Sequence, residues 1–169
     1  LYAIKLISQE REDFKLILTW IGYWSKKIMN IVKKLWIEEY IYFTWYIDNN
    51  QIHYLYNCAD LFILASTVTK IWNEQFGFVF LEAMASWLPI VWTWSGSLPY
   101  VINPLWRELS SAWDFYMLSQ KLNKLLNDEK LRNIYGISNR NYIEENFNPR
   151  NIMKDRINFY KYVYNDYHK

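Results

Sequence analysis

Three residues near the middle of the chain, Glu74, Gly77 and Glu82, have the types and spacing of a binding site for hydroxyl groups and phosphate. Glu74 stands in a loop after an apolar run, Gly77 leaves the backbone unobstructed, and Glu82 falls in the first turns of a predicted helix. The N-terminus of a helix offers unpaired N–H groups and partial positive charge to a phosphate. A carboxylate one turn further on can accept hydrogen bonds from a diol such as ribose, and a carboxylate before the helix can reach a second hydroxylated group. The arrangement suits a sugar nucleotide.

A structural interpretation of the same two glutamates has to be weighed against this one. Carboxylates eight residues apart on an amphipathic segment are common, and alone the pair would more often be solvated surface than a site. The surrounding segment, "WNEQFGFVFLEAMASWLP" at residues 72–89, lies within an ordered series of strand-like and helix-like runs. That context favours the binding site.

The elements that must position these residues alternate between strand and helix, which is typical of parallel βαβ units. The predicted strands are residues 15–19, 41–44, 61–65 and 88–91. The predicted helices include residues 1–8, 28–35, 51–58, 78–86, 118–125, 131–145 and 151–164, with a turn-rich stretch at 95–114. No repeat or linker divides the chain, so we predict one α/β domain over residues 1–169, a Rossmann-like parallel sheet flanked by helices with a helical C-terminal tail.

The loops that follow the strands are the expected place for a ligand. In open α/β sheets, ligands bind beyond the carboxyl ends of the strands. The loops after Thr19, Thr44, Ala65 and Val91 are therefore expected to surround one site.

Composition excludes several other classes of protein. The 169 residues are 52% hydrophobic and 21% charged, enough apolar material for a buried core. A net charge of +2, without a basic run, predicts no nucleic-acid partner. The single cysteine, Cys58, cannot form an internal disulfide, and no cluster has metal-ligand spacing, so we expect no metal site and a cytoplasmic protein. No apolar run reaches the roughly 20 residues that span a bilayer.

The segment "EQFGFVFLEAMAS" resembles the E-x7-E motif of family 4 glycosyltransferases, also called group 1 glycosyltransferases. The similarity extends to "LILTWIGYW", to "IYFTWYIDNNQIHYLYNCADLFILAS" and to "LPIVWTWSGSLPYVI", and so covers most of the chain to about Ile102. The resemblance implies the C-terminal, nucleotide-sugar-binding half of a two-domain GT-B enzyme. It also implies that the acceptor domain, and the Arg and Lys that bind the diphosphate, lie upstream of Leu1.

Carried over position by position, the resemblance assigns a catalytic role to Glu74, in contact with the transferred sugar, and the ribose hydroxyls to Glu82. Further donor-binding positions follow from it: Phe76, Gly77 and Phe78, whose backbone faces the sugar and diphosphate, and Tyr46 and Ile47, which lie against the base.

The implied activity is retaining transfer of a hexosyl group from a nucleotide diphosphate sugar to a hydroxyl of a glycan, lipid or other acceptor, without a cofactor or an obligatory metal. We expect these residues alone to be inactive. Two alternatives stay open: a non-catalytic carbohydrate-binding module, suggested by 20% aromatic residues, and a GT-B epimerase or phosphorylase. Localisation at the inner membrane surface as a peripheral protein is an alternative to a purely cytoplasmic one.

Tryptophan and glycine occur in abnormal numbers, since the chain has ten Trp and four Gly. Where the family pattern has glycine, this chain has Trp20, Trp24, Trp36, Trp45, Trp87, Trp92, Trp94, Trp106 and Trp113. Counted with the four glycines these nine come to 13, close to the roughly 12 glycines expected for this length. Trp36 and Trp87 follow predicted helices, where a left-handed residue favours glycine. The hypothesis is that the gene reads UGA as glycine and that the printed tryptophans mark those codons.

Overall fold

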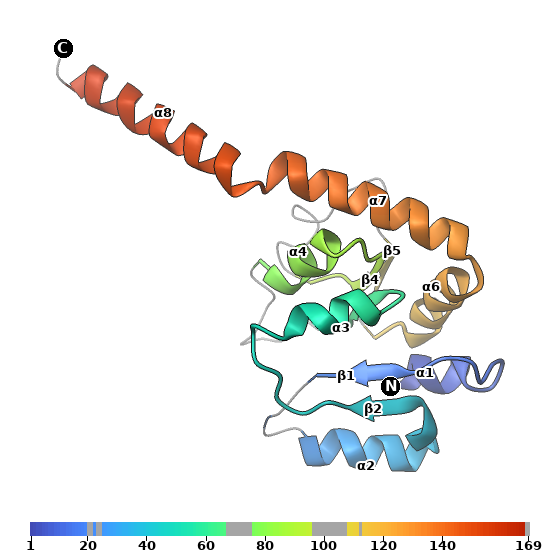
Figure 1. Cartoon of the computed structure of the whole chain (residues 1–169). Helices are drawn as coiled ribbons and strands as arrows, with labels where there is room; N and C mark the ends of the chain where they lie inside the picture. The colour runs from blue at the N-terminus through green and yellow to red at the C-terminus, as the bar shows by residue number, and fades with distance from the viewer. Residues whose placement is uncertain (20–21, 23–24, 67–75, 96–107, 112, 168–169) are drawn as a thin grey trace.

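The computed structural model describes residues 1–19, 22, 25–66, 76–95, 108–111 and 113–167. The strands within these residues are paired in parallel (Figure 1). Strand β1 (Leu16–Leu18) pairs with β2 (Ile41–Phe43), and β4 (Ile90–Thr93) lies between β3 (Phe62–Leu64) and β5 (Glu108–Ser110). Helices flank these strands, so the predicted α/β class with a parallel sheet is confirmed.

The helices match those predicted from the sequence to within a few residues at their ends. They are α1 (Tyr2–Ile7), α2 (Ser25–Leu35), α3 (Ile52–Cys58), α4 (Phe78–Ala85), α6 (Phe115–Asn127), α7 (Glu129–Asn146) and α8 (Pro149–Tyr167), with a 3-10 turn at Glu38–Tyr40. Strand β5 lies within the stretch predicted to be turn-rich, residues 95–114, and was not predicted as a strand. That strand has one apolar residue, Leu109, between two polar ones, and so carries no strand-like apolar run.

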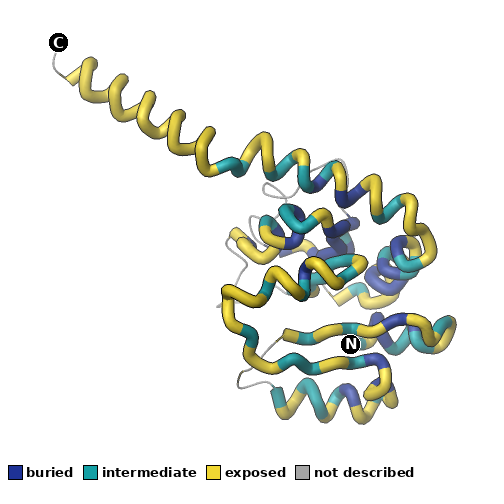
Figure 2. Tube along the Cα trace, viewed as in Figure 1, coloured by how far each residue is buried: buried dark blue, intermediate teal, exposed yellow. Residues whose placement is uncertain are grey.

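The core forms two clusters because successive side chains of a strand point to opposite faces. On β4, Val91 belongs to one cluster, while Ile90 and Trp92 belong to the other. The first cluster packs against α1, α2 and α6, and the second is built largely from α3 and α4. Dark blue segments in Figure 2 follow these packed elements. All four residues of β4 are buried, and burial on both faces explains its nearly continuous apolar run.

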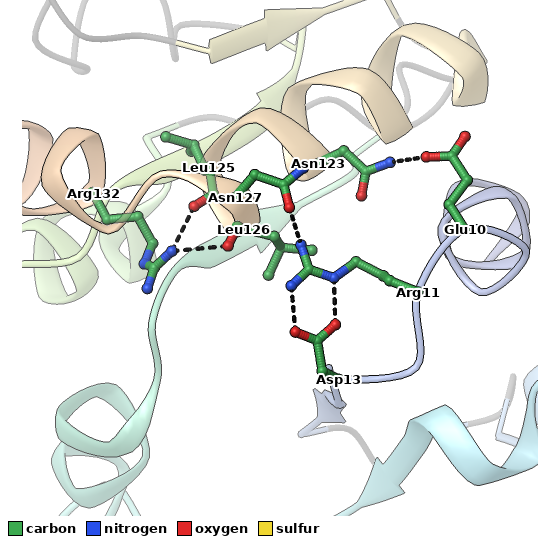
Figure 3. Close-up of polar contacts among 8 residues, drawn as sticks. All are labelled: Glu10, Arg11, Asp13, Asn123, Leu125, Leu126, Asn127 and Arg132. Atoms are coloured by element: carbon green, nitrogen blue, oxygen red, sulfur yellow. Dashed lines mark hydrogen bonds and ion pairs between the residues drawn. The ribbon is translucent and has the colours of Figure 1, made fainter.

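Polar contacts fasten the turn after α1 to the C-terminal half of α6 (Figure 3). The Arg11 guanidinium pairs with Asp13 through two hydrogen bonds of 2.6 Å and donates a third, of 2.8 Å, to the side-chain oxygen of Asn127. Asn123 Nδ2 donates to Glu10 at 2.7 Å. Arg132 Nη1 donates to the carbonyls of Leu125 and Leu126, at 2.7 and 3.1 Å, which are among the last carbonyls of α6.

A buried carboxylate joins β5 to two helices. Glu108 Oε2 lies 2.7 Å from Lys121 Nζ, and Oε1 lies 2.5 Å from Lys124 Nζ and 2.9 Å from the Tyr135 hydroxyl. Burial alone would raise the pKa of Glu108, but the hydrogen bonds from both lysines and the tyrosine outweigh it and hold the pKa below its ordinary value. The ion pairs compensate for placing a charge inside the protein.

The tail helix α8 contains no buried residue, and it extends away from the rest of the chain in Figures 1 and 2. Its exposed side chains include Met153, Ile157, Tyr160 and Tyr164, at a spacing that puts them on one helical face. Among the helices described, α8 included, none is long and apolar enough to cross a membrane.

Several tryptophans occupy unusual positions for that residue. Trp36, Trp45, Trp87 and Trp113 have φ of 55°, 59°, 62° and 72°, and within the described ranges they are the only residues other than glycine with positive φ. The left-handed conformation predicted for Trp36 and Trp87 is therefore confirmed. Trp92 is fully buried, and its indole Nε1 has no hydrogen-bond partner among the described residues.

Candidate functional site

The candidate loops lie side by side where neighbouring parallel strands end. At the end of β4, the buried Thr93 hydroxyl donates to the carbonyl of Ser66, which follows β3. At the end of β2, the Thr44 backbone N–H donates to the Leu18 carbonyl at 3.2 Å. These contacts tie each loop to its neighbour, as expected where parallel strands end together.

The N-terminus of α4 is shaped by Gly77. This residue is buried and left-handed, with φ 69° and ψ 56°, a conformation that glycine adopts without a steric penalty. No side chain of the described residues caps the helix here. The Phe80 N–H donates to the Gly77 carbonyl at 2.9 Å, and the N–H groups of Phe78 and Val79, which precede the first bonds within the helix, are available to an anion.

Aromatic rings border this helix end. The rings of Phe76 and Phe78 lie 4.9 Å apart on either side of Gly77, and both side chains are exposed. Phe76 also packs edge-on against Phe147, directly after α7, at 6.3 Å. Among the described residues, aromatic side chains thus border the start of α4.

Glu82 lies on α4 five residues after Gly77, which is about 7.5 Å along the helix axis. Glu82 is exposed, and its carboxylate Oε2 accepts a hydrogen bond of 2.9 Å from the hydroxyl of Tyr56 on α3. Within the described part of the chain, no other side chain hydrogen-bonds this carboxylate. An anion site and a carboxylate therefore stand about one and a half turns apart on one helix.

Tyr56 was not anticipated from the sequence as part of the site. Tyr56 is a buried residue of α3, its ring packs in the second core cluster, and its hydroxyl reaches Glu82. Burial, together with the hydrogen bond to Glu82, raises the pKa of Tyr56 far above its usual value. The phenol consequently stays protonated and remains a donor. The available signal was a tyrosine on the apolar face of a short helix, where a hydroxyl needs a partner.

A second helix begins at a carboxyl end, after β1. Gly22 N donates to Ser25 Oγ at 3.0 Å, and Ser25 Oγ donates to the Gly22 carbonyl at 2.8 Å, so the two residues close a turn at the start of α2. Helices α2 and α4 thus both present an N-terminus after a parallel strand.

The other predicted site residues are Tyr46, Ile47 and Glu74. Tyr46 and Ile47 lie in the loop after β2, with Tyr46 74% exposed, and no hydrogen bond or ring contact of the described residues joins them to α4. Glu74 lies outside the described residues. No group of three metal-ligating side chains occurs in the ranges that the structure covers.

Comparisons with known proteins match most of this chain. N-acetyl-alpha-D-glucosaminyl L-malate synthase of Bacillus anthracis is 32% identical over 155 residues, covering 91% of this chain and 38% of that protein. The solved sucrose-phosphate synthase of Thermosynechococcus elongatus superposes with a TM-score of 0.80 at 19% identity, over 98% of this chain and 42% of its own. HepE of Anabaena, solved in complex with UDP, gives a TM-score of 0.79 at 18% identity, over 95% and 44%.

The chain spans about two fifths of the length of the relatives it matches. The structural similarity confirms the predicted fold, the parallel α/β architecture of GT-B glycosyltransferases with a helical tail. Residues 1–142 match the family Glycosyl transferases group 1. The chain therefore belongs to the group 1 glycosyltransferases.

Proposed function

We propose that this chain is the nucleotide-sugar-binding domain of a retaining glycosyltransferase of family 4, acting on a hydroxyl acceptor. The observation that carries the proposal is Glu82, which lies on α4 five residues after Gly77, where no side chain of the described residues caps the helix N-terminus. A diphosphate at the helix end and a ribose at the carboxylate would together match the ends of a nucleoside diphosphate. A structural relative solved with UDP supports this choice of ligand.

Each predicted residue has a role in the proposal. Glu82 binds the ribose hydroxyls, and the backbone at Phe76, Gly77 and Phe78 faces the diphosphate and sugar. Glu74 contacts the transferred sugar as the catalytic residue. Tyr46 and Ile47 lie against the base, in keeping with their place in the loop after β2.

Transfer breaks the bond between the anomeric carbon and the diphosphate oxygen and forms a bond from that carbon to the acceptor oxygen on the same face. The acceptor proton passes to the leaving diphosphate oxygen, on which negative charge develops. The N-termini of α2 and α4 would stabilise that charge, with basic residues upstream of this chain completing the site. No metal is required in this scheme.

The proposal treats residues 1–169 as one domain, with the acceptor domain supplied by the rest of the protein. The greater length of the relatives supports this. The exposed apolar side chains of α8 offer a surface for that missing domain. Peripheral association with the inner face of a membrane is compatible with it.

A carbohydrate-binding module would need tryptophans aligned on one surface. Trp36 and Trp45 instead precede and follow β2, so the strand separates them. These two described tryptophans therefore give this alternative no support. An epimerase or phosphorylase would share the same nucleotide or phosphate site and differ in the rest of the protein.

The test is calorimetric binding of UDP, GDP and ADP sugars to the protein expressed from its complete gene. Glu82→Ala is expected to weaken binding of the preferred donor by about tenfold or more, because charge-assisted hydrogen bonds are lost. Glu145→Ala removes an exposed carboxylate from α7 and serves as the matched control. Unchanged affinity in Glu82→Ala, or preference for plain oligosaccharides over every nucleotide, would refute the proposal.

We further propose that nine of the ten tryptophans are glycines in the natural protein, with UGA read as glycine. Positive φ at Trp36, Trp45, Trp87 and Trp113, and the unpartnered indole of Trp92, support this. A side chain in the left-handed region costs about 1–2 kcal/mol. Mass spectrometry of peptides from the natural protein decides the matter, and tryptophan found at those positions would overturn it.

A further inference from the structure

We infer that Tyr56 is a positioning residue for recognition of the nucleotide ribose: its hydroxyl holds the Glu82 carboxylate in the orientation that accepts the ribose hydroxyls. The inference rests on the function proposed above for Glu82. It adds a residue from a different helix to the site.

The hydrogen bond joins a buried donor to an exposed acceptor. Tyr56 is 8% exposed, whereas Glu82 lies on the exposed side of α4, and the bond from Tyr56 Oη to Glu82 Oε2 measures 2.9 Å. A surface glutamate samples several rotamers and loses that freedom on binding a ligand. A bond from a fixed donor removes part of this cost before the ligand arrives.

The donor is fixed because the Tyr56 ring packs among other aromatic rings. It lies edge-on to Phe62 at 6.0 Å, and Phe62 lies edge-on to Phe80 at 5.6 Å. Phe62 belongs to β3 and Phe80 to α4, so the hydroxyl is placed by the sheet and by the same helix that carries Glu82. Both ends of the hydrogen bond are therefore anchored to one packed unit.

The bond leaves most of the carboxylate open to a ligand. A carboxylate has about four acceptor positions, of which Tyr56 occupies one on Oε2. Among the described residues, no other side chain donates to Glu82. The remaining positions can accept two hydroxyl groups of a ribose.

The variant Tyr56→Phe removes the hydroxyl and keeps the ring. The probe is whichever of UDP, GDP and ADP binds the wild-type protein most tightly, titrated calorimetrically against the protein expressed from its complete gene. We expect Tyr56→Phe to weaken binding by about threefold to tenfold, as for loss of one hydrogen bond to a charged group. Tyr54→Phe, on the same helix but 66% exposed, is the matched control and should leave affinity unchanged.

A purely structural tether between α3 and α4 would not depend on the ribose, so two further measurements separate the roles. With Glu82→Ala already present, Tyr56→Phe should weaken binding no further. Tyr56→Phe should also weaken binding of the corresponding 2′-deoxynucleotide less than it weakens binding of the ribonucleotide. Thermal unfolding of each variant identifies any general loss of structure.

The outcomes distinguish this inference from the proposed function. If Glu82→Ala weakens binding and Tyr56→Phe does not, the inference is wrong while the proposed function stands. If Tyr56→Phe weakens binding equally with Glu82 present or absent, Tyr56 acts elsewhere and the inference is again wrong. If Glu82→Ala has no effect, or no nucleotide binds, the proposed function fails and the inference fails with it.

Discussion

Gly136 of α7 lies against the backbone carbonyl of Trp87, so closely that an ideal Cβ on Gly136 would stand 2.0 Å from the Trp87 oxygen. Two hydrogen bonds join the same segments: Asn139 Nδ2 donates to the Leu88 carbonyl at 2.8 Å, and Arg140 Nη1 donates to the Ala85 carbonyl at 2.5 Å. Helix α7 thereby holds the C-terminal end of α4, and α4 carries the candidate site.

Gly136→Ala should therefore destabilise the protein. The added carbon meets backbone atoms, which cannot rotate away, so we expect the free energy of unfolding to fall by about 1–3 kcal/mol even though alanine favours helix. Urea unfolding measures the change. Ile137→Ala, at the next and exposed position, is the control and should shift it by less than about 0.5 kcal/mol. A Gly136→Ala protein as stable as the wild type would mean that the two helices separate without cost.

Replacing left-handed tryptophans by glycine should stabilise the printed sequence. Trp36 and Trp113 are 80% and 77% exposed, so little packing is lost when their side chains are removed. Each change to glycine is expected to raise the free energy of unfolding by about 1 kcal/mol, because the penalty of positive φ disappears. Denaturant unfolding of the single variants measures the gain.

Trp94→Gly is the comparison for these variants. Trp94 is also exposed, at 53%, but it is not among the residues with positive φ. Glycine there should reduce stability by about 0.5–1 kcal/mol through greater freedom of the unfolded chain. An equal gain in stability from glycine at Trp36, Trp113 and Trp94 would show that loss of the indole, and not relief of the strained positive φ, stabilises the protein.

Stability should depend on pH through Glu108. Since hydrogen bonds from Lys121, Lys124 and Tyr135 hold its folded-state pKa below the ordinary 4.5, its contribution is present above pH 4.5 and is lost as the pH falls through the folded-state value. Glu108→Gln leaves Lys121 and Lys124 without their negatively charged partner. Because water partly solvates both lysines, we expect the free energy of unfolding at neutral pH to fall by only about 2 kcal/mol. The substitution should also make the free energy of unfolding depend less on pH in the acidic range.

Unfolding measured across acidic to neutral pH checks this expectation. Glu145→Gln, an exposed carboxylate on α7, should leave both the level and the slope unchanged. An acid limb equally steep in wild type and Glu108→Gln would exclude the buried carboxylate as its source.

Removing α8 should leave the stability of the rest of the chain unchanged. None of the residues of Pro149–Tyr167 is buried, so a chain ending at Asn148 is expected to unfold within about 0.5 kcal/mol of the wild type. A chain ending at residue 141 also removes Tyr142 and Ile143, which pack on the second core cluster, and should be clearly less stable. A large loss from the first truncation would contradict the separation of α8 from the core.

Local patterns predicted most of the helices and strands. Leu118, Leu122 and Leu125 repeat at helical spacing, and all three are buried on α6. Trp36 and Trp87 follow helix ends, and their left-handed backbone was anticipated for that reason. Such features depend on neighbours in the sequence, which is why the sequence suffices.

The features that were missed depend on partners distant in the sequence. Strand β5 is a short polar segment whose Glu108 is compensated by Lys121 and Lys124 on α6. The Tyr56 and Glu82 pair is separated by 26 residues, and only the packing of α3 against α4 brings it together. Spacing along one element could place Glu82, but it could not reveal the donor that orients it.

The ring contacts from Phe80 through Phe62 to Tyr56 have a consequence for how the protein can vary. Interior residues that never meet a ligand help to determine where a surface carboxylate stands. Natural variation at Phe62 or Phe80 would then alter affinity for the nucleotide along with stability, so selection for one property would restrict sequence change in the other.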